Sequence, residues 1–128
     1  MSEPAHAAAD FEDLGLRLDE EPLGPAGVVV TATGELDIAT APLVRDRLIA
    51  AIDAGKRDVV LDLGPVTFMD SVALAAIIHA RKHLGDAGRM AIALARDSYT
   101  RLVFEIAGLP PRLELFETRA EAVAHVSR

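Results

Sequence analysis

The stretch DVVLDLG at positions 58–64 constrains the fold of this 128-residue chain more than any other. Four of its seven residues are Val or Leu, a density that is typical of a central strand covered on both faces. Helical patterns occur on either side of it, at about 40–55 and 71–84. The sequence therefore predicts an α/β fold in which helices pack onto a buried central strand.

Further strands and helices follow the same alternation. Residues 14–18 have the two-residue period of a half-buried strand, and VVVTATG at 28–34 is β-branched, so we expect an antiparallel hairpin with a long turn through DEEPLGPAG. The segments MAIALA and LELF predict two more strands, and YTRLVFEIAG and TRAEAVAHVSR predict two more helices. The fold class is α/β: a small mixed sheet of about five strands with about four helices, antiparallel at one edge and joined elsewhere by crossover helices.

Length, charge and composition limit the domain organisation and the partners. We expect residues 1–13, which are rich in Ala and acids, to form a mobile tail, and residues 14–128 to form a single domain. The sequence has no cysteine, no signal-peptide pattern and no apolar run of about 20 residues, so we expect a cytoplasmic protein without membrane insertion. Its net charge of -7 argues against direct binding to nucleic acid.

The stretch TFMDSVALAAI at 67–77 places an acid and a hydroxyl at the start of a predicted helix. Unpaired amide groups and the helix dipole favour anions there, so Ser71 is a candidate carrier of a phosphoryl group. Capping of the helix by Asp70 or Ser71 explains the same residues without any modification. The stretch alone therefore leaves both interpretations open.

Catalytic, metal and cofactor chemistry find little support. His79 lies eight residues after Ser71, about 12 Å further along the same helix, which is too far for a base that activates the hydroxyl. His79 and His83 supply two metal ligands at most, and no phosphate-binding glycine loop is present. We expect no cofactor, no metal site and no enzyme activity.

The combination of four segments carries a family resemblance. TFMDSVALAAI resembles the central motif of the STAS domain in small bacterial anti-sigma factor antagonists, where Phe, a hydrophobe, Asp, Ser, then Ser or Thr, Gly and Leu lead into a helix. GELDIATA at 34–41, VVLDL at 59–63 and FEIAGL at 104–109 match other family segments in the right order and spacing. The resemblance covers approximately residues 14 to 126.

The resemblance implies a regulatory cycle. The unmodified antagonist captures an anti-sigma factor, a serine kinase of the GHKL type, and so frees a sigma factor; phosphorylation by the kinase reverses the capture, and a phosphatase is the further partner. Ser71 matches the phosphoacceptor of the family. Together with the outward stripe of the helix at 71–84, the expected partner-binding residues are Glu35, Leu36, Asp37, Thr40, Met69, Asp70, Ser71, Val72, Ala76 and His79.

The sequence departs from the family after the acceptor, where Val72-Ala73 replaces the usual Ser/Thr-Gly. The two added side chains could obstruct a kinase active site. One alternative is a STAS subunit that is never phosphorylated and binds the ATPase of an ABC lipid transporter; a further one is a small enzyme that uses Ser71. The sequence names neither the sigma factor, the kinase nor the signal, and it leaves the oligomeric state open.

Overall fold

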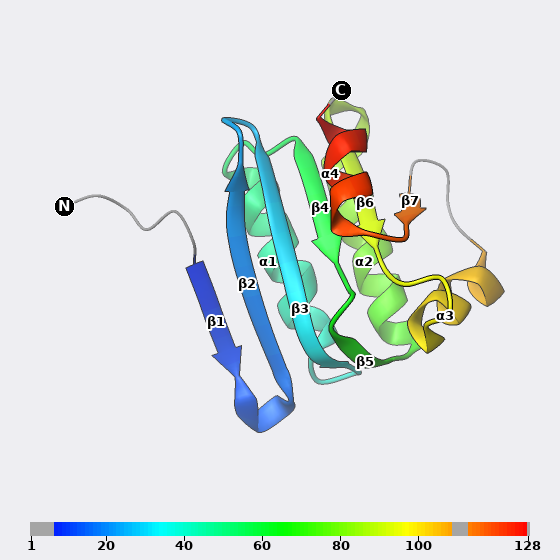
Figure 1. Cartoon of the computed structure of the whole chain (residues 1–128). Helices are drawn as coiled ribbons and strands as arrows, with labels where there is room; N and C mark the ends of the chain where they lie inside the picture. The colour runs from blue at the N-terminus through cyan, green and yellow to red at the C-terminus, as the bar shows by residue number, and fades with distance from the viewer. Residues whose placement is uncertain (1–6, 109–112, 128) are drawn as a thin grey trace.

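The computed structural model describes residues 7–108 and 113–127, which form one mixed sheet with helices on both faces (Figure 1). Helices α1 and α2 lie side by side on one face, and α4 covers β4 and β6 on the other. The sheet order is β1-β2-β3-β4-β6-β7, with β5 beside the end of β3. The elements are β1 (Ala7–Phe11), η1 (Glu12–Leu14), β2 (Leu16–Leu23), β3 (Gly27–Leu36), α1 (Ala41–Asp53), β4 (Asp58–Asp62), β5 (Val66–Met69), α2 (Ser71–Leu84), η2 (Gly85–Ala87), β6 (Arg89–Ala93), α3 (Tyr99–Ala107), β7 (Leu113–Phe116) and α4 (Arg119–Val126).

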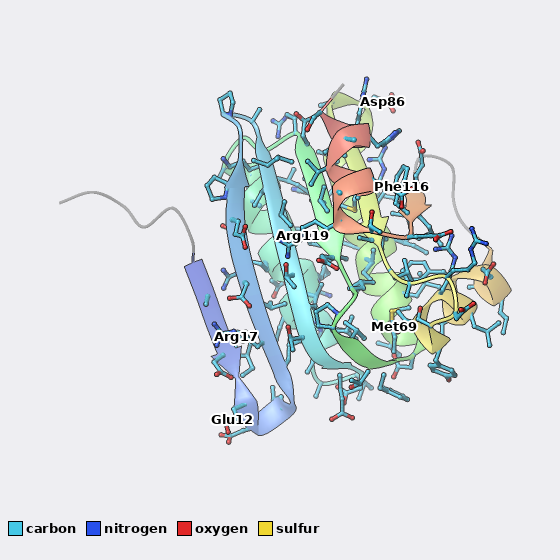
Figure 2. The ribbon with its side chains drawn as sticks, in the orientation of Figure 1. Glu12, Arg17, Met69, Asp86, Phe116 and Arg119 are labelled. Carbon is cyan, nitrogen blue, oxygen red and sulfur yellow. The ribbon has the colours of Figure 1, made fainter. Side chains whose placement is uncertain are left out.

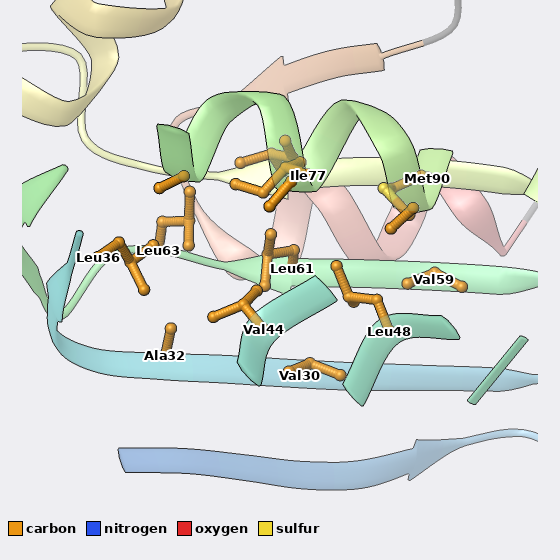
Figure 3. Packing of buried hydrophobic residues seen from close by; sticks show 14 of the residues in the cluster. Val30, Ala32, Leu36, Val44, Leu48, Val59, Leu61, Leu63, Ile77 and Met90 are labelled. Carbon is orange, nitrogen blue, oxygen red and sulfur yellow. The ribbon is translucent and has the colours of Figure 1, made fainter. Parts of the chain in front are cut away.

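Strand β4 lies in the middle of the sheet and confirms the expected buried strand. It pairs in parallel with β3 on one side and β6 on the other. Val59 and Leu61 join the main core beneath α1 and α2, whereas Val60 faces the smaller core beneath α4. Figure 3 shows Leu61 packed among residues of both helices and β3. The apolar side chains on both faces of β4 are therefore covered, those on one face by α1 and α2 and those on the other face by α4.

The sheet contains seven strands, two more than expected. The hairpin of β2 and β3 is antiparallel as predicted, but β2 continues to Leu23, so the turn is shorter than the sequence suggested. Strand β5 is too short, at four residues, to show a clear sequence period.

The other additional strand corrects the expected mobile tail. Ala7–Phe11 forms β1 and pairs antiparallel with β2, and Glu12–Leu14 forms the turn between them. The segment AAADF carries no alternation of large apolar side chains, so its sequence did not predict a strand. The strand forms through backbone hydrogen bonds to the edge of β2. Residues 1–6, the rest of the predicted tail, lie outside the described residues.

Candidate functional site

The sheet brings together the two segments that the sequence singled out. Strand β5 runs parallel to the end of β3, with Leu36 opposite Met69 and Glu35 opposite Phe68. The amide of Asp70 donates a hydrogen bond to the carbonyl of Leu36 at 3.2 Å, which ties the start of α2 to the end of β3. Figure 2 shows Met69 in the lower part of the molecule, at the end of β5. The two segments therefore form one surface region.

Asp70 caps the helix that Ser71 begins. Its Oδ1 accepts hydrogen bonds from the amides of Val72 at 3.0 Å and Ala73 at 3.1 Å. Ser71 follows as the first residue of α2 and is exposed. Two of the first-turn amides that we expected to hold a phosphate on Ser71 are thus already bonded to Asp70, and a phosphate there would lie next to a carboxylate.

Removal of this cap gives a direct stability test. An Asp70→Ala protein is expected to lose about 1 kcal/mol of unfolding free energy, because two amides of the first turn lose their acceptor. Urea unfolding followed by circular dichroism measures the loss. Asp70→Asn keeps a capping oxygen and should stay within a few tenths of a kcal/mol of the wild type. Equal loss in both variants would contradict the capping role.

The turn from β3 to α1 is built by Asp37 and Thr40. Asp37 Oδ1 accepts hydrogen bonds from the amides of Ala39 and Thr40 at 2.9 and 3.1 Å. The Thr40 hydroxyl donates to the carbonyl of Glu35 at 2.9 Å and accepts from the amide of Asp37 at 2.8 Å. Thr40 is the residue before α1, and its side chain holds the loop without making a capping bond. Ile38, which the sequence analysis did not select, is exposed on this turn.

The predicted partner-binding residues divide into exposed and buried groups. Those with side chains at the surface or partly so are Glu35, Asp37, Asp70, Ser71, Val72 and His79. Those that are buried are Leu36, Thr40, Met69 and Ala76. Leu36, Met69 and Ala76 pack into the main core, so their side chains do not reach the surface, and the binding role of the set stays a prediction.

A groove between α1 and α2 opens beside Ser71. Its lining residues are Ala41, Pro42, Arg45, Val72, Ala75, Ala76 and His79. Val72 is 44% exposed and lines it, whereas Ala73 is 2% exposed and faces the core. Of the two side chains that replace Ser/Thr-Gly, only that of Val72 therefore changes the surface.

The second histidine of α2, His83, has a structural partner. His83 Nε2 lies 2.7 Å from Asp53 Oδ1, so this pair joins α2 to α1. Across residues 7–108 and 113–127, no hydrogen bond links Ser71 to a histidine or a carboxylate, and no three His, Asp or Glu side chains gather where they could hold a metal ion. None of the described helices combines the length and the apolar character needed to span a membrane.

The fold and this site match one known family. A family model described as the STAS domain matches residues 20–122. The chain belongs to the STAS domain family. In this family member, the acid and hydroxyl at the start of α2 and the turn after β3 are the segments that carried the resemblance in the sequence.

Similar proteins share a regulatory description. The anti-sigma-F factor antagonist RsfB of Mycobacterium tuberculosis is 28% identical over 98 residues, which cover 77% of this chain and 80% of RsfB. The anti-sigma factor antagonist SpoIIAA in its unphosphorylated form is 25% identical, with a TM-score of 0.71 over 86% of this chain and 96% of that one. An anti-sigma factor antagonist from Mycobacterium paratuberculosis has the same fold, at 23% identity and a TM-score of 0.77 with complete coverage of both chains. The predicted STAS-like fold is confirmed, and the relatives are regulators rather than enzymes.

Proposed function

We propose that this STAS protein is an anti-sigma factor antagonist that acts in the cytoplasm. Its unmodified form binds a GHKL-type anti-sigma serine kinase and releases a sigma factor, and phosphorylation of Ser71 ends the binding. The observation that carries the proposal is the exposed Ser71 hydroxyl at the first position of α2, directly after a capping acid. The similarity to RsfB and SpoIIAA, which are anti-sigma factor antagonists, supports the same role.

The partner surface in this proposal surrounds Ser71. Glu35 and Asp37 border it at the turn after β3, and Val72 and His79 extend it along the groove between α1 and α2. The buried members of the predicted set act by shape: Thr40 holds the turn, and Leu36 and Met69 anchor the paired ends of β3 and β5. The kinase thus binds a preformed surface.

Phosphorylation ends the binding by charge and size. A phosphoryl group adds about -1.5 to -2 charges at neutral pH. The Asp70 carboxylate stands beside it and already accepts the amides of Val72 and Ala73. The added charge therefore projects into the interface, where it repels acidic groups and prevents close contact. A phosphatase that hydrolyses phosphoserine returns the protein to its binding form.

The replacement of Ser/Thr-Gly by Val72-Ala73 does not prevent the kinase from phosphorylating Ser71. Ala73 adds no atoms to the surface because its side chain is buried. Val72 adds a branched apolar side chain next to the acceptor, so we expect slower phosphate transfer rather than none.

An affinity experiment in the native bacterial lysate tests the proposal. The tagged protein is incubated without ATP and then with ATP and magnesium; bound proteins are identified by sequence, and the mass of the bait is measured. We expect a GHKL kinase, a single phosphate that maps to Ser71, and loss of the complex on ATP addition. A Val72→Thr bait, run in parallel, should acquire the phosphate faster.

Two outcomes would contradict the proposal in different ways. Recovery of an ABC transporter ATPase with an unmodified bait would assign the chain to the unphosphorylated type of STAS subunit. Recovery of a GHKL kinase without phosphate on Ser71, even in the Val72→Thr bait, would show that the protein binds the kinase permanently. Phosphorylation would then not control the binding.

A further inference from the structure

The large exposed hydrophobic side chains lie on elements at one end of the molecule. Among the described residues they are Leu14, Ile38, Phe68, Val72, Tyr99, Leu102 and Ile106. The elements that carry them are η1, the turn after β3, β5, the start of α2 and α3, and all of these lie in the lower half of Figure 1. Single exposed hydrophobic residues are normal, but their gathering at one end of a molecule marks an interaction surface.

Helix α3 contributes the most continuous part of this surface. Tyr99, Leu102 and Ile106 follow one another at intervals of three and four residues, so they share one face of the helix. They are 59%, 49% and 78% exposed. Thr100 and Phe104 are buried on the opposite face, where α3 packs against β5 and α2. We call the three exposed residues the α3 stripe; none of them was selected from the sequence.

Phe68 is an exposed apolar residue on the strand between the α3 stripe and the start of α2. It is 39% exposed and lies on β5, the strand against which α3 packs. Ser71 follows three residues later, at the start of α2. Exposed apolar side chains therefore lie on β5, at the start of α2 and on α3, three elements that are neighbours in the fold.

The charges around this surface are mainly acidic. Glu35, Asp97 and Glu105 are exposed at this end. Of the arginines described at this end, Arg96 bonds to Glu117, and Arg101 donates a hydrogen bond to the carbonyl of Leu94 at 3.2 Å. A complementary protein surface would present apolar side chains bordered by Lys or Arg.

We infer that the anti-sigma factor docks on the α3 stripe as well as on the region around Ser71, and that it meets the stripe with an apolar surface bordered by basic side chains. This inference rests on the proposed function and extends its interface to α3. The partner bridges Ser71 and the α3 stripe through Phe68. The stripe supplies affinity that does not depend on the acceptor, while Ser71 controls release.

Binding measurements with the purified kinase from the affinity experiment test this extension. Leu102→Ser is expected to weaken binding about ten-fold in calorimetric titration, since the interface would lose the apolar area that the Leu side chain buries. Leu102→Met keeps the apolar contact and should stay within about two-fold of the wild type. Glu105→Lys, which places a positive charge beside the stripe, should weaken binding about five-fold and more strongly at low salt. Because Leu102 and Glu105 are exposed, urea unfolding should show unchanged stability in all three variants.

The possible outcomes separate this inference from the function on which it rests. Full affinity in Leu102→Ser, combined with weak binding by a Ser71→Asp variant, would overturn the docking on α3 and leave the proposed function intact. Full affinity in both variants would overturn both. If sedimentation shows a dimer of the free protein that Leu102→Ser dissociates without any change in kinase affinity, the stripe binds a second copy and the inference is wrong.

Discussion

A Ser71→Asp protein is expected to bind its anti-sigma kinase about 100-fold more weakly than the wild type, while Ser71→Ala keeps full affinity. The aspartate places a second carboxylate beside Asp70, whose Oδ1 already accepts the amides of Val72 and Ala73. With those amides taken, the new charge is left uncompensated when the partner excludes water, and an uncompensated charge at an interface weakens binding by about 2–5 kcal/mol. Alanine removes only a hydroxyl and adds no charge.

Calorimetric titration with the purified kinase measures both affinities. Ser127→Asp is the matched control, because it makes the same substitution at an exposed residue directly after α4. It should bind like the wild type. The Ser71→Ala protein should also acquire no phosphate when it is incubated with kinase and ATP. Equal affinities of Ser71→Asp and Ser71→Ala would refute the switch.

Gly34→Ala is expected to destabilise the protein by about 3 kcal/mol or more. Gly34 has a φ of 114°, which side-chain-bearing residues rarely adopt. A Cβ atom on it would stand 2.1 Å from the backbone carbonyl oxygen of Gly15, at the turn between η1 and β2. Backbone atoms cannot move aside as a side chain can, so β3 or this turn has to shift. The shift would also disturb Glu35, whose amide donates a hydrogen bond to the same carbonyl at 2.9 Å.

Urea unfolding of Gly34→Ala and Gly24→Ala separates the two contributions. Gly24 also has a positive φ, 63°, but a Cβ atom there would meet nothing within 4 Å. Gly24→Ala should therefore lose only about 1 kcal/mol, the strain of the backbone conformation alone. Similar losses of unfolding free energy in the two variants would show that the contact with Gly15 does not contribute to the destabilisation.

The site was predictable where local rules decide structure. Helix α2 begins at Ser71 and ends at Leu84, as the sequence indicated, because an Asp cap and a following glycine act within a single turn. Thr118 likewise caps α4 by accepting the amide of Glu121, a contact within one turn. Exposure was less predictable: Ala76 was placed on the outward face of α2, but α1 packs there and buries it. A helical wheel does not show which neighbouring helix will cover a face.

The α/β class, the central strand, the four helices and the acid-hydroxyl pair at the start of α2 were predictable from the sequence, because they depend on side-chain period and on contacts within one turn. The tertiary structure decided which of the selected residues reach the surface, how β5 aligns Ser71 with the turn after β3, that β1 joins the sheet, and that α3 adds its apolar stripe to the same end. Most of these features depend on contacts between residues far apart in the chain; β1 is the exception, since it pairs with the neighbouring strand β2 across a short turn. Burial and strand pairing are properties of such contacts, and no local pattern of residues encodes them.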